Sequence, residues 1–296
     1  MTSIAVEART RMISMETIAS ILTKSADFLQ RKGVENPRLD SEWMLAEVMG
    51  YPRMRLFLEY ERPLAEDVIT RMRSMVVRRG KREPLQYILG YVMFGGVRIQ
   101  VDRRALIPRP ETEELVDIIC QRFRNRTGLN ILDLGTGSGA IACALAYALP
   151  DSSVWATDKS VDALSLAREN ARTNGIGEDR IRWLEGSWFE PVGDRLFDLI
   201  VSNPPYLAKS EMDSVQPEVG QYEPLTALVA EDDGLADLKS IISGSLTRLH
   251  PGGSLYLETG CSQHAALADY CRSLGINDFA SERDLSRKDR YFRFTV

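Results

Sequence analysis

Histidines, paired cysteines and long apolar runs are scarce in this sequence of 296 residues. With only two histidines, the chain is not expected to hold a His-rich metal site. The four cysteines form no CxxC pair, so we expect reduced, mostly buried thiols in a cytoplasmic protein. No run of about 18 uncharged apolar residues occurs, and the opening MTSIAVEARTRMIS lacks the apolar segment of a signal peptide. We therefore expect neither a membrane span nor secretion.

The charge is unevenly distributed along the chain. The formal net charge is -5, but residues 1–90 carry 15 Lys and Arg against 12 Asp and Glu, whereas the remainder carries 22 against 30. An acidic body is a poor match for a phosphate backbone, so no direct nucleic-acid binding is expected. The stretch RMRSMVVRRGKR (71–82) has six basic residues and no acid. Such a run is typical of a solvated helix end, and it is also compatible with contact to an acidic protein or to RNA.

Apolar spacing divides the chain into three expected parts. Residues 1–84 predict a small helical domain, because apolar residues such as Ile18, Leu22 and Leu29 recur on one helical face. Residues 85–106 predict a β-hairpin linker around Gly95-Gly96. From residue 107 to 296, strands and helices alternate, which is typical of a mainly parallel α/β sheet with helices on both faces. Ligands of such sheets bind beyond the carboxyl ends of the strands.

A glycine-rich loop follows the first strand of this α/β part. The loop is Gly135-Thr136-Gly137-Ser138-Gly139, and Asp158 ends the next expected strand. Glycines allow a ligand to approach the backbone closely, and an acid at the second strand end can accept hydrogen bonds from both ribose hydroxyls. The pattern also fits a variant NAD fingerprint. However, Asp133 precedes the glycines, and an acid there would repel a pyrophosphate, so S-adenosylmethionine is favoured.

A rigid polar segment ends another expected strand, FDLIVS, at residue 202. The segment is Asn203-Pro204-Pro205-Tyr206. Each proline fixes its own φ, and Pro205 also restricts the backbone of Pro204. The Asn203 side-chain oxygen and the Pro204 carbonyl can together accept both hydrogens of one planar NH2 group, and Tyr206 can stack on the group that carries it. The segment by itself leaves a glutamine amide and an adenine both open as the methyl acceptor.

Several longer motifs narrow this choice. IPRPETEELV (107–116), ILDLGTGSGAIA (131–142), SNPPYL (202–207) and YEPLTAL (222–228) together resemble the release factor glutamine methyltransferases, the HemK/PrmC family. The resemblance runs from about residue 16 to the end. It implies a class I S-adenosylmethionine-dependent methyltransferase fold, Rossmann-like, with a mainly parallel seven-stranded sheet and a small N-terminal helical domain. The implied reaction is N5-methylation of the glutamine in the GGQ motif of peptide chain release factors.

The resemblance also implies roles for particular residues. Gly135 to Gly139 would line the methionine part of the cofactor, Asp158 would bind its ribose, and Trp188 would lie by its adenine. Asn203 would touch cofactor and substrate, and Asn203, Pro204, Pro205 and Tyr206 would grip the glutamine amide, with Asn203, Pro204 and Tyr206 as the catalytic set.

The main rival function is an N6-adenine methyltransferase acting on DNA or RNA. Such an enzyme must extrude its base and generally presents a basic surface, which the acidic catalytic part here lacks. A NAD-dependent oxidoreductase and a non-enzymatic binding module remain as weaker alternatives. We expect a monomer whose partner is a release factor, recognised by the helical domain.

Overall fold

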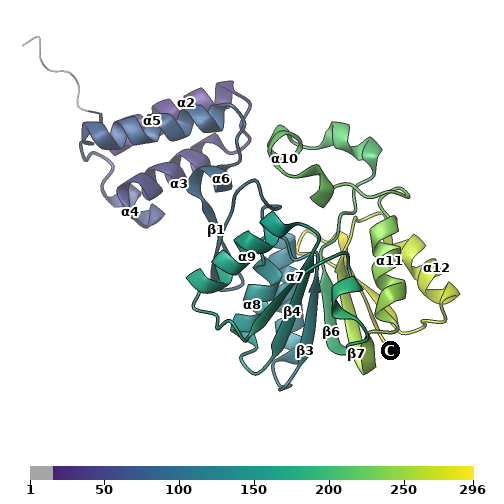
Figure 1. Cartoon of the computed structure of the whole chain (residues 1–296). Coiled ribbons are helices and arrows are strands. Elements are labelled where there is room, and N and C mark those ends of the chain that lie inside the picture. Colours follow the sequence, from purple (N-terminus) through teal and green to yellow (C-terminus); the bar gives the residue numbers. More distant parts are fainter. Residues whose placement is uncertain (1–15) are drawn as a thin grey trace, which may run out of the picture. The chain divides into compact units, whose positions relative to one another are not determined.

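The computed structural model describes residues 16–296, and the chain divides into two compact units between Leu89 and Gly90 (Figure 1). The first unit is helical and the second is built around a sheet. The helices of the first unit are α2 (Ile18–Arg31), α3 (Pro37–Met49), α4 (Arg53–Leu58), α5 (Glu66–Gly80) and α6 (Leu85–Leu89).

The first unit is held by one apolar core between its three longer helices, α2, α3 and α5. Ile18, Leu22 and Leu29 of α2 are buried in it, as their helical spacing predicts. Thr17 begins α2 with a capping box shared with Ser20, and Gly50 ends α3 in the left-handed conformation, at φ 64°. Local sequence signals thus set the helix ends, and the buried stripes set their packing.

Some basic residues of the stretch 71–82 form ion pairs within this unit. Arg79 is buried and donates from Nε to Asp40 Oδ2 at 2.7 Å, and Arg78 pairs with Glu83 at 2.6 Å. A buried charge needs such a partner, because removing one member leaves the other desolvated and unpaired. Two of the six basic side chains therefore stabilise the helical fold.

The expected hairpin begins later than the sequence indicated. Residues 85–89 form helix α6, whose Leu85, Ile88 and Leu89 pack on the helical core. This short apolar run suits helix and strand alike, and the aromatic and β-branched residues that follow it favoured a strand. The hairpin itself consists of β1 (Tyr91–Phe94) and β2 (Val97–Gln100), which pair antiparallel. Its turn has Gly95 at φ 53° and Gly96 at φ 83°, backbone angles that favour glycine.

The second unit contains a seven-stranded sheet in the order β5-β4-β3-β6-β7-β9-β8, which confirms the expected fold class. The first five strands in this order are parallel, and β9 pairs antiparallel with both β7 and β8. Sequence analysis did not anticipate β8, a half-exposed edge strand. The strands are β3 (Asn130–Leu134), β4 (Ser153–Asp158), β5 (Ile181–Glu185), β6 (Phe197–Ser202), β7 (Leu249–Glu258), β8 (Phe279–Arg283) and β9 (Asp289–Thr295).

Helices cover both faces of this sheet (Figure 1). The group α7, α8 and α9 lies on one face, and α11 and α12 lie on the other, where they enclose an apolar core with residues of β3, β6 and β7. The helices of this unit are α7 (Pro110–Phe123), α8 (Ala140–Ala148), α9 (Val161–Thr173), α10 (Pro217–Tyr222), α11 (Ala236–Ser245) and α12 (His264–Ser273). No helix within residues 16–296 is long and apolar enough to cross a membrane.

The strand register brings three polar segments of the sequence to the carboxyl ends of neighbouring strands. Leu134, the last residue of β3, pairs with Thr157 of β4 on one side and with Ser202 of β6 on the other. The glycine loop, Asp158 and Asn203 follow these three positions directly. Parallel pairing thus brings three segments that are separate in the sequence to neighbouring strand ends.

Candidate active site

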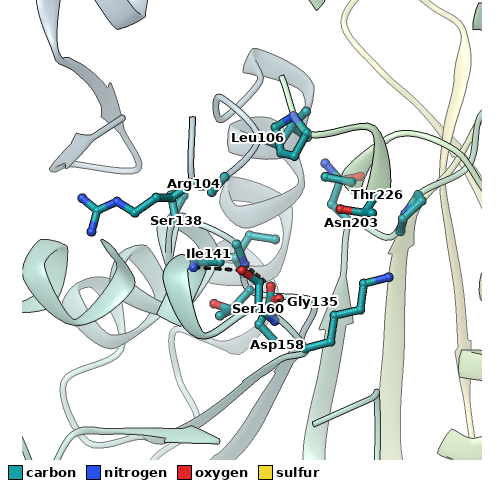
Figure 2. A pocket seen from close by; sticks show the side chains of 18 of the residues that line it. Arg104, Leu106, Gly135, Ser138, Ile141, Asp158, Ser160, Asn203 and Thr226 are labelled. Carbon is teal, nitrogen blue, oxygen red and sulfur yellow. Dashed lines mark hydrogen bonds between the residues drawn. The ribbon is translucent and has the colours of Figure 1, made fainter. Parts of the chain in front are cut away.

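A pocket of about 290 Å³ opens at these strand ends (Figure 2). Figure 2 shows Asp158 and Ser160 on one side of it and Asn203 with Thr226 on another. Loops after β3, β4, β5 and β6 form its walls, together with residues of the segments 104–112 and 224–227 and with Asp237. The volume and mixed lining are suited to a small organic ligand.

The glycine loop forms one wall because its backbone turns sharply. Gly135, Gly137 and Gly139 have φ values of 69°, 55° and 78°. A Cβ on Gly135 would lie 3.2 Å from the Trp188 ring, so only glycine allows the backbone and the indole to come this close. A Cβ on Gly139 would meet Ala167 at 2.8 Å. Gly139 is therefore required for packing against α9, and it does not belong to the pocket lining, whereas the other four loop residues do.

Asp158 is tied to the glycine loop by its carboxylate. Oδ2 accepts a hydrogen bond from the Gly137 N–H at 2.8 Å, and Oδ1 accepts one from the Ser160 N–H at 2.9 Å (Figure 2). Each carboxylate oxygen has two lone pairs, and Asp158 lines the pocket half-buried. The side chain is thus held in place and retains acceptor capacity toward a ligand.

Trp188 lies beside the loop in a strained backbone conformation, at φ 43°. Thr157 Oγ1 donates to the Trp188 carbonyl at 3.1 Å, and the Trp188 side chain hydrogen-bonds to Asp237. Burial raises the pKa of Asp237, and the positive charge of Lys159 and the bond from Trp188 partly offset this. No sequence pattern indicated Asp237, which reaches the pocket from α11.

Asp133 lies behind the glycine loop and does not line the pocket, although the sequence argument had it facing the ligand. It is fully buried, and its Oδ2 accepts the Thr136 hydroxyl at 2.5 Å, whereas its Oδ1 has no hydrogen-bond partner within residues 16–296. Burial raises the pKa of Asp133 to about 7. Its position indicates that it braces the loop through Thr136.

Asn203 is oriented by a neighbouring hydroxyl. Its Nδ2 donates to Thr112 Oγ1 at 2.9 Å, and Thr112 Oγ1 donates to Glu258 Oε2 at 2.6 Å. Among the described residues, none donates a hydrogen bond to Asn203 Oδ1 or to the Pro204 carbonyl. Two acceptors on adjacent residues are therefore left for an incoming donor.

The three residues that follow Asn203 differ in whether they line the pocket. Pro205 lines the pocket, Pro204 is buried, and neither Pro204 nor Tyr206 belongs to the lining. The Tyr206 hydroxyl donates to Glu258 Oε1 at 3.1 Å, so its ring is anchored at the tip. Burial raises the pKa of Tyr206 well above its usual range, and a nearby carboxylate adds to this effect, so the phenol keeps its proton.

Sequence reasoning missed several lining residues with polar side chains: Arg104, Thr112, Lys159, Ser160, Ser187, Thr226 and Asp237. Thr112 and Thr226 lie inside quoted motifs but had no role assigned. The hydrogen bonds of Thr112 are to Asn203 and Glu258, which are distant in the chain, and no local pattern reveals them.

Curated relatives match nearly the whole chain. A release factor glutamine methyltransferase of Geobacter sulfurreducens is 40% identical over 274 residues, which are 93% of this chain and 95% of that protein. One from Deinococcus radiodurans is 38% identical over 93% of this chain and 97% of its own length. This chain belongs to the release factor glutamine methyltransferase family.

Two family models match the chain, and solved structures share its fold. The model of the PrmC N-terminal domain matches residues 20–90, and that of the methyltransferase small domain matches residues 113–219. Among solved structures, the T. thermophilus 16S rRNA N2 G1207 methyltransferase in complex with AdoMet and guanosine aligns with a TM-score of 0.51 and 17% identity, over 69% of this chain and 49% of that one. At this identity the likeness supports the class I methyltransferase fold alone.

Proposed function

We propose that this member of the release factor glutamine methyltransferase family transfers a methyl group from S-adenosylmethionine to the N5 amide nitrogen of the glutamine in the GGQ motif of peptide chain release factors. The observation that carries the proposal is the pair of unused acceptors, Asn203 Oδ1 and the Pro204 carbonyl, on a rigid segment that borders the cofactor-sized pocket. Their chemistry matches the two N–H hydrogens of one primary amide.

The pocket residues fit S-adenosylmethionine. Gly135 leaves a space beside Trp188 that a Cβ would fill, Asp158 offers acceptors suited to ribose hydroxyls, and Trp188 offers a flat apolar face. Thr136, Gly137 and Ser138 would hold the methionine part. When bound, S-adenosylmethionine supplies an activated methyl group on a sulfonium.

The chain's own contribution is to orient the substrate amide. An amide nitrogen is a weak nucleophile because its lone pair is delocalised into the carbonyl. By accepting both N–H hydrogens, Asn203 Oδ1 and the Pro204 carbonyl would raise electron density on the nitrogen and fix its direction of attack. Orientation of this kind contributes on the order of 7–11 kcal/mol, and the same acceptors stabilise the positive charge that develops on nitrogen. The proton then leaves to water, so the mechanism requires no strong base.

We further propose that the first unit recognises the release factor at a surface away from the glutamine. Three apolar side chains of α4 are exposed: Met54, Phe57 and Leu58, at 67%, 41% and 86%. Adjacent exposed apolar groups mark a protein-binding surface. Leu58→Glu should raise KM for the intact release factor and leave kcat unchanged. Leu285→Glu in the second unit, where the side chain is 88% exposed, is the matched control.

Mass spectrometry of a purified release factor after incubation with enzyme and S-adenosylmethionine tests the reaction. One added methyl group on the GGQ glutamine is expected, and none on a release factor with alanine at that position. Parallel incubations with DNA and RNA test the adenine alternative. Methylated adenine together with an unmodified release factor would overturn the proposal.

We also propose a cytoplasmic, monomeric enzyme. The four cysteines are free thiols, two of them, Cys143 and Cys271, buried, which is typical of a reducing compartment. Light scattering during size-exclusion chromatography should give the mass of one chain, and a mass of two or more chains would contradict the proposed monomeric state.

A further inference from the structure

A hydrogen-bonded chain links the substrate-facing segment to two buried side chains that are distant in sequence. Thr112 lies in the first turn of α7 and Glu258 ends β7, and they are 4% and 1% exposed. Asn203 Nδ2 donates to Thr112 Oγ1, which donates to Glu258 Oε2, whereas the Tyr206 hydroxyl donates to Glu258 Oε1. One carboxylate thus anchors both ends of the segment from Asn203 to Tyr206.

The Thr112 hydroxyl has a single proton, and this determines which atom donates in each hydrogen bond between Asn203, Thr112 and Glu258. Burial raises the pKa of Glu258, and the hydrogen bonds from Thr112 and Tyr206 and the charge of Arg290 offset this in favour of the carboxylate. The carboxylate has only acceptors, so the hydroxyl proton points to Glu258. The remaining lone pairs of Thr112 Oγ1 can then only accept, which requires Asn203 to present Nδ2 rather than Oδ1. A flipped Asn203 amide would set two oxygens against each other with no proton between them, and its NH2 group would be presented in place of Oδ1.

We propose that Thr112 and Glu258 are positioning residues for methyl transfer, which hold the Asn203 amide with Oδ1 presented to the NH2 group of the methyl acceptor. The inference rests on the proposed function. Glu258 acts through Thr112 and Tyr206 and need not touch the substrate, and Thr112 acts through Asn203. The position of Asn203 after β6 brings it to the pocket, and the buried pair then selects which of its two polar atoms serves as the acceptor.

A purely structural role for the pair predicts a different outcome. Loss of a buried hydrogen bond by itself would lower thermal stability, with cofactor affinity and turnover falling together as the folded fraction falls. Loss of amide orientation instead lowers kcat in fully folded enzyme, because an acceptor misplaced by about 1 Å can cost about a hundredfold in rate. Turnover measured beside cofactor affinity therefore separates the two roles.

Thr112→Val tests the inference, since valine has nearly the same shape and lacks the hydroxyl, and Thr112→Ser is the matched control that keeps it. With a release factor as substrate, Thr112→Val should lower kcat about 10- to 100-fold. Its Kd for S-adenosylhomocysteine, measured by calorimetry below the melting temperature, should stay within about twofold of the parent value. Thr112→Ser should retain most of the parent kcat.

Glu258→Gln supplies a second, independent measurement. It should lower kcat in the same way. The double variant with Thr112→Val should lose little more kcat than either single variant, because both changes break the same series of hydrogen bonds. A kcat for Thr112→Val close to that of the parent, or an equal loss in Thr112→Ser, would overturn the inference while the parent still methylates the release factor. A parent enzyme inactive on the release factor would overturn the proposed function and this inference with it.

Discussion

Replacing Asn203 by alanine removes the acceptor on which the proposed chemistry depends. The change deletes Oδ1, which has no partner within the described residues, and Nδ2, which donates to Thr112 Oγ1 at 2.9 Å. Thr112 keeps its bond to Glu258, so the surrounding network loses one member and stays otherwise intact. The expected effects on turnover, stability and cofactor binding can therefore be worked out separately.

The effect on turnover should be the largest. An oriented polar group aimed at developing charge contributes about 2.7–4 kcal/mol to the transition state, so kcat should fall about 10²- to 10³-fold. The lost bond to Thr112 has a net value of about 1 kcal/mol, which lowers the melting temperature by roughly 2–4 °C. The glycine loop, Asp158 and Trp188 remain in place, so cofactor affinity should weaken by less than about tenfold, or about 1.4 kcal/mol.

Single-turnover methylation of a release factor gives the rate, and titration calorimetry with S-adenosylhomocysteine gives the affinity. Asn277→Ala, which changes an exposed asparagine between α12 and β8, is the matched control and should behave as the parent. A single-turnover rate for Asn203→Ala within about threefold of the parent rate would refute the assignment of Oδ1 as a transition-state acceptor. Loss of affinity as large as the loss of rate would instead assign Asn203 to cofactor binding.

Three further changes concern Asp158 and two residues that support the glycine loop, Gly139 and Asp133. Asp158→Ala should raise the Kd for S-adenosylhomocysteine by tenfold or more at about 1.4 kcal/mol per tenfold, and unchanged calorimetric binding would exclude the ribose role. Gly139 has φ 78°, and a Cβ there would meet Ala167 at 2.8 Å, so Gly139→Ala should lower the free energy of unfolding in urea melts by about 2–4 kcal/mol. The control Gly128→Ala, at φ 67° with no atom within 4 Å, should lower it by about 1–2 kcal/mol. Equal losses in the two variants would contradict the packing argument. Because the pKa of Asp133 is raised to about 7, the folded protein binds more protons than the unfolded chain between about pH 4 and pH 7, and this group lowers stability as pH rises through that window. Asp133→Asn should therefore gain stability relative to the parent by up to about 1.4 kcal/mol per pH unit between pH 5 and 7, and parallel melting curves would contradict the raised pKa.

Local motifs made much of the site predictable. The glycine loop, Asp158 and Asn203 each follow a strand whose apolar pattern is strong, so their arrival at one sheet edge could be inferred from the sequence. The hairpin boundary was misplaced because residues 85–89 are short and apolar, and such runs suit helix and strand equally. Asp133 was assigned to the wrong side of the loop, since a strand-end position does not specify which way a side chain points.

The sequence by itself determined the alternation of strands and helices from β3 to β7, the tight glycine turn and the stiffness of Asn203 to Tyr206, because each depends on residues near one another in the chain. Only the tertiary structure decided which groups meet around that segment. Thr112 lies 91 positions before Asn203, and Glu258 lies 146 positions after Thr112. Their hydrogen bonds arise from the pairing of β6 with β7 and the placement of the first turn of α7, and no periodicity encodes such contacts. Which polar atom of Asn203 is left without a partner among the described residues is therefore a property of the fold.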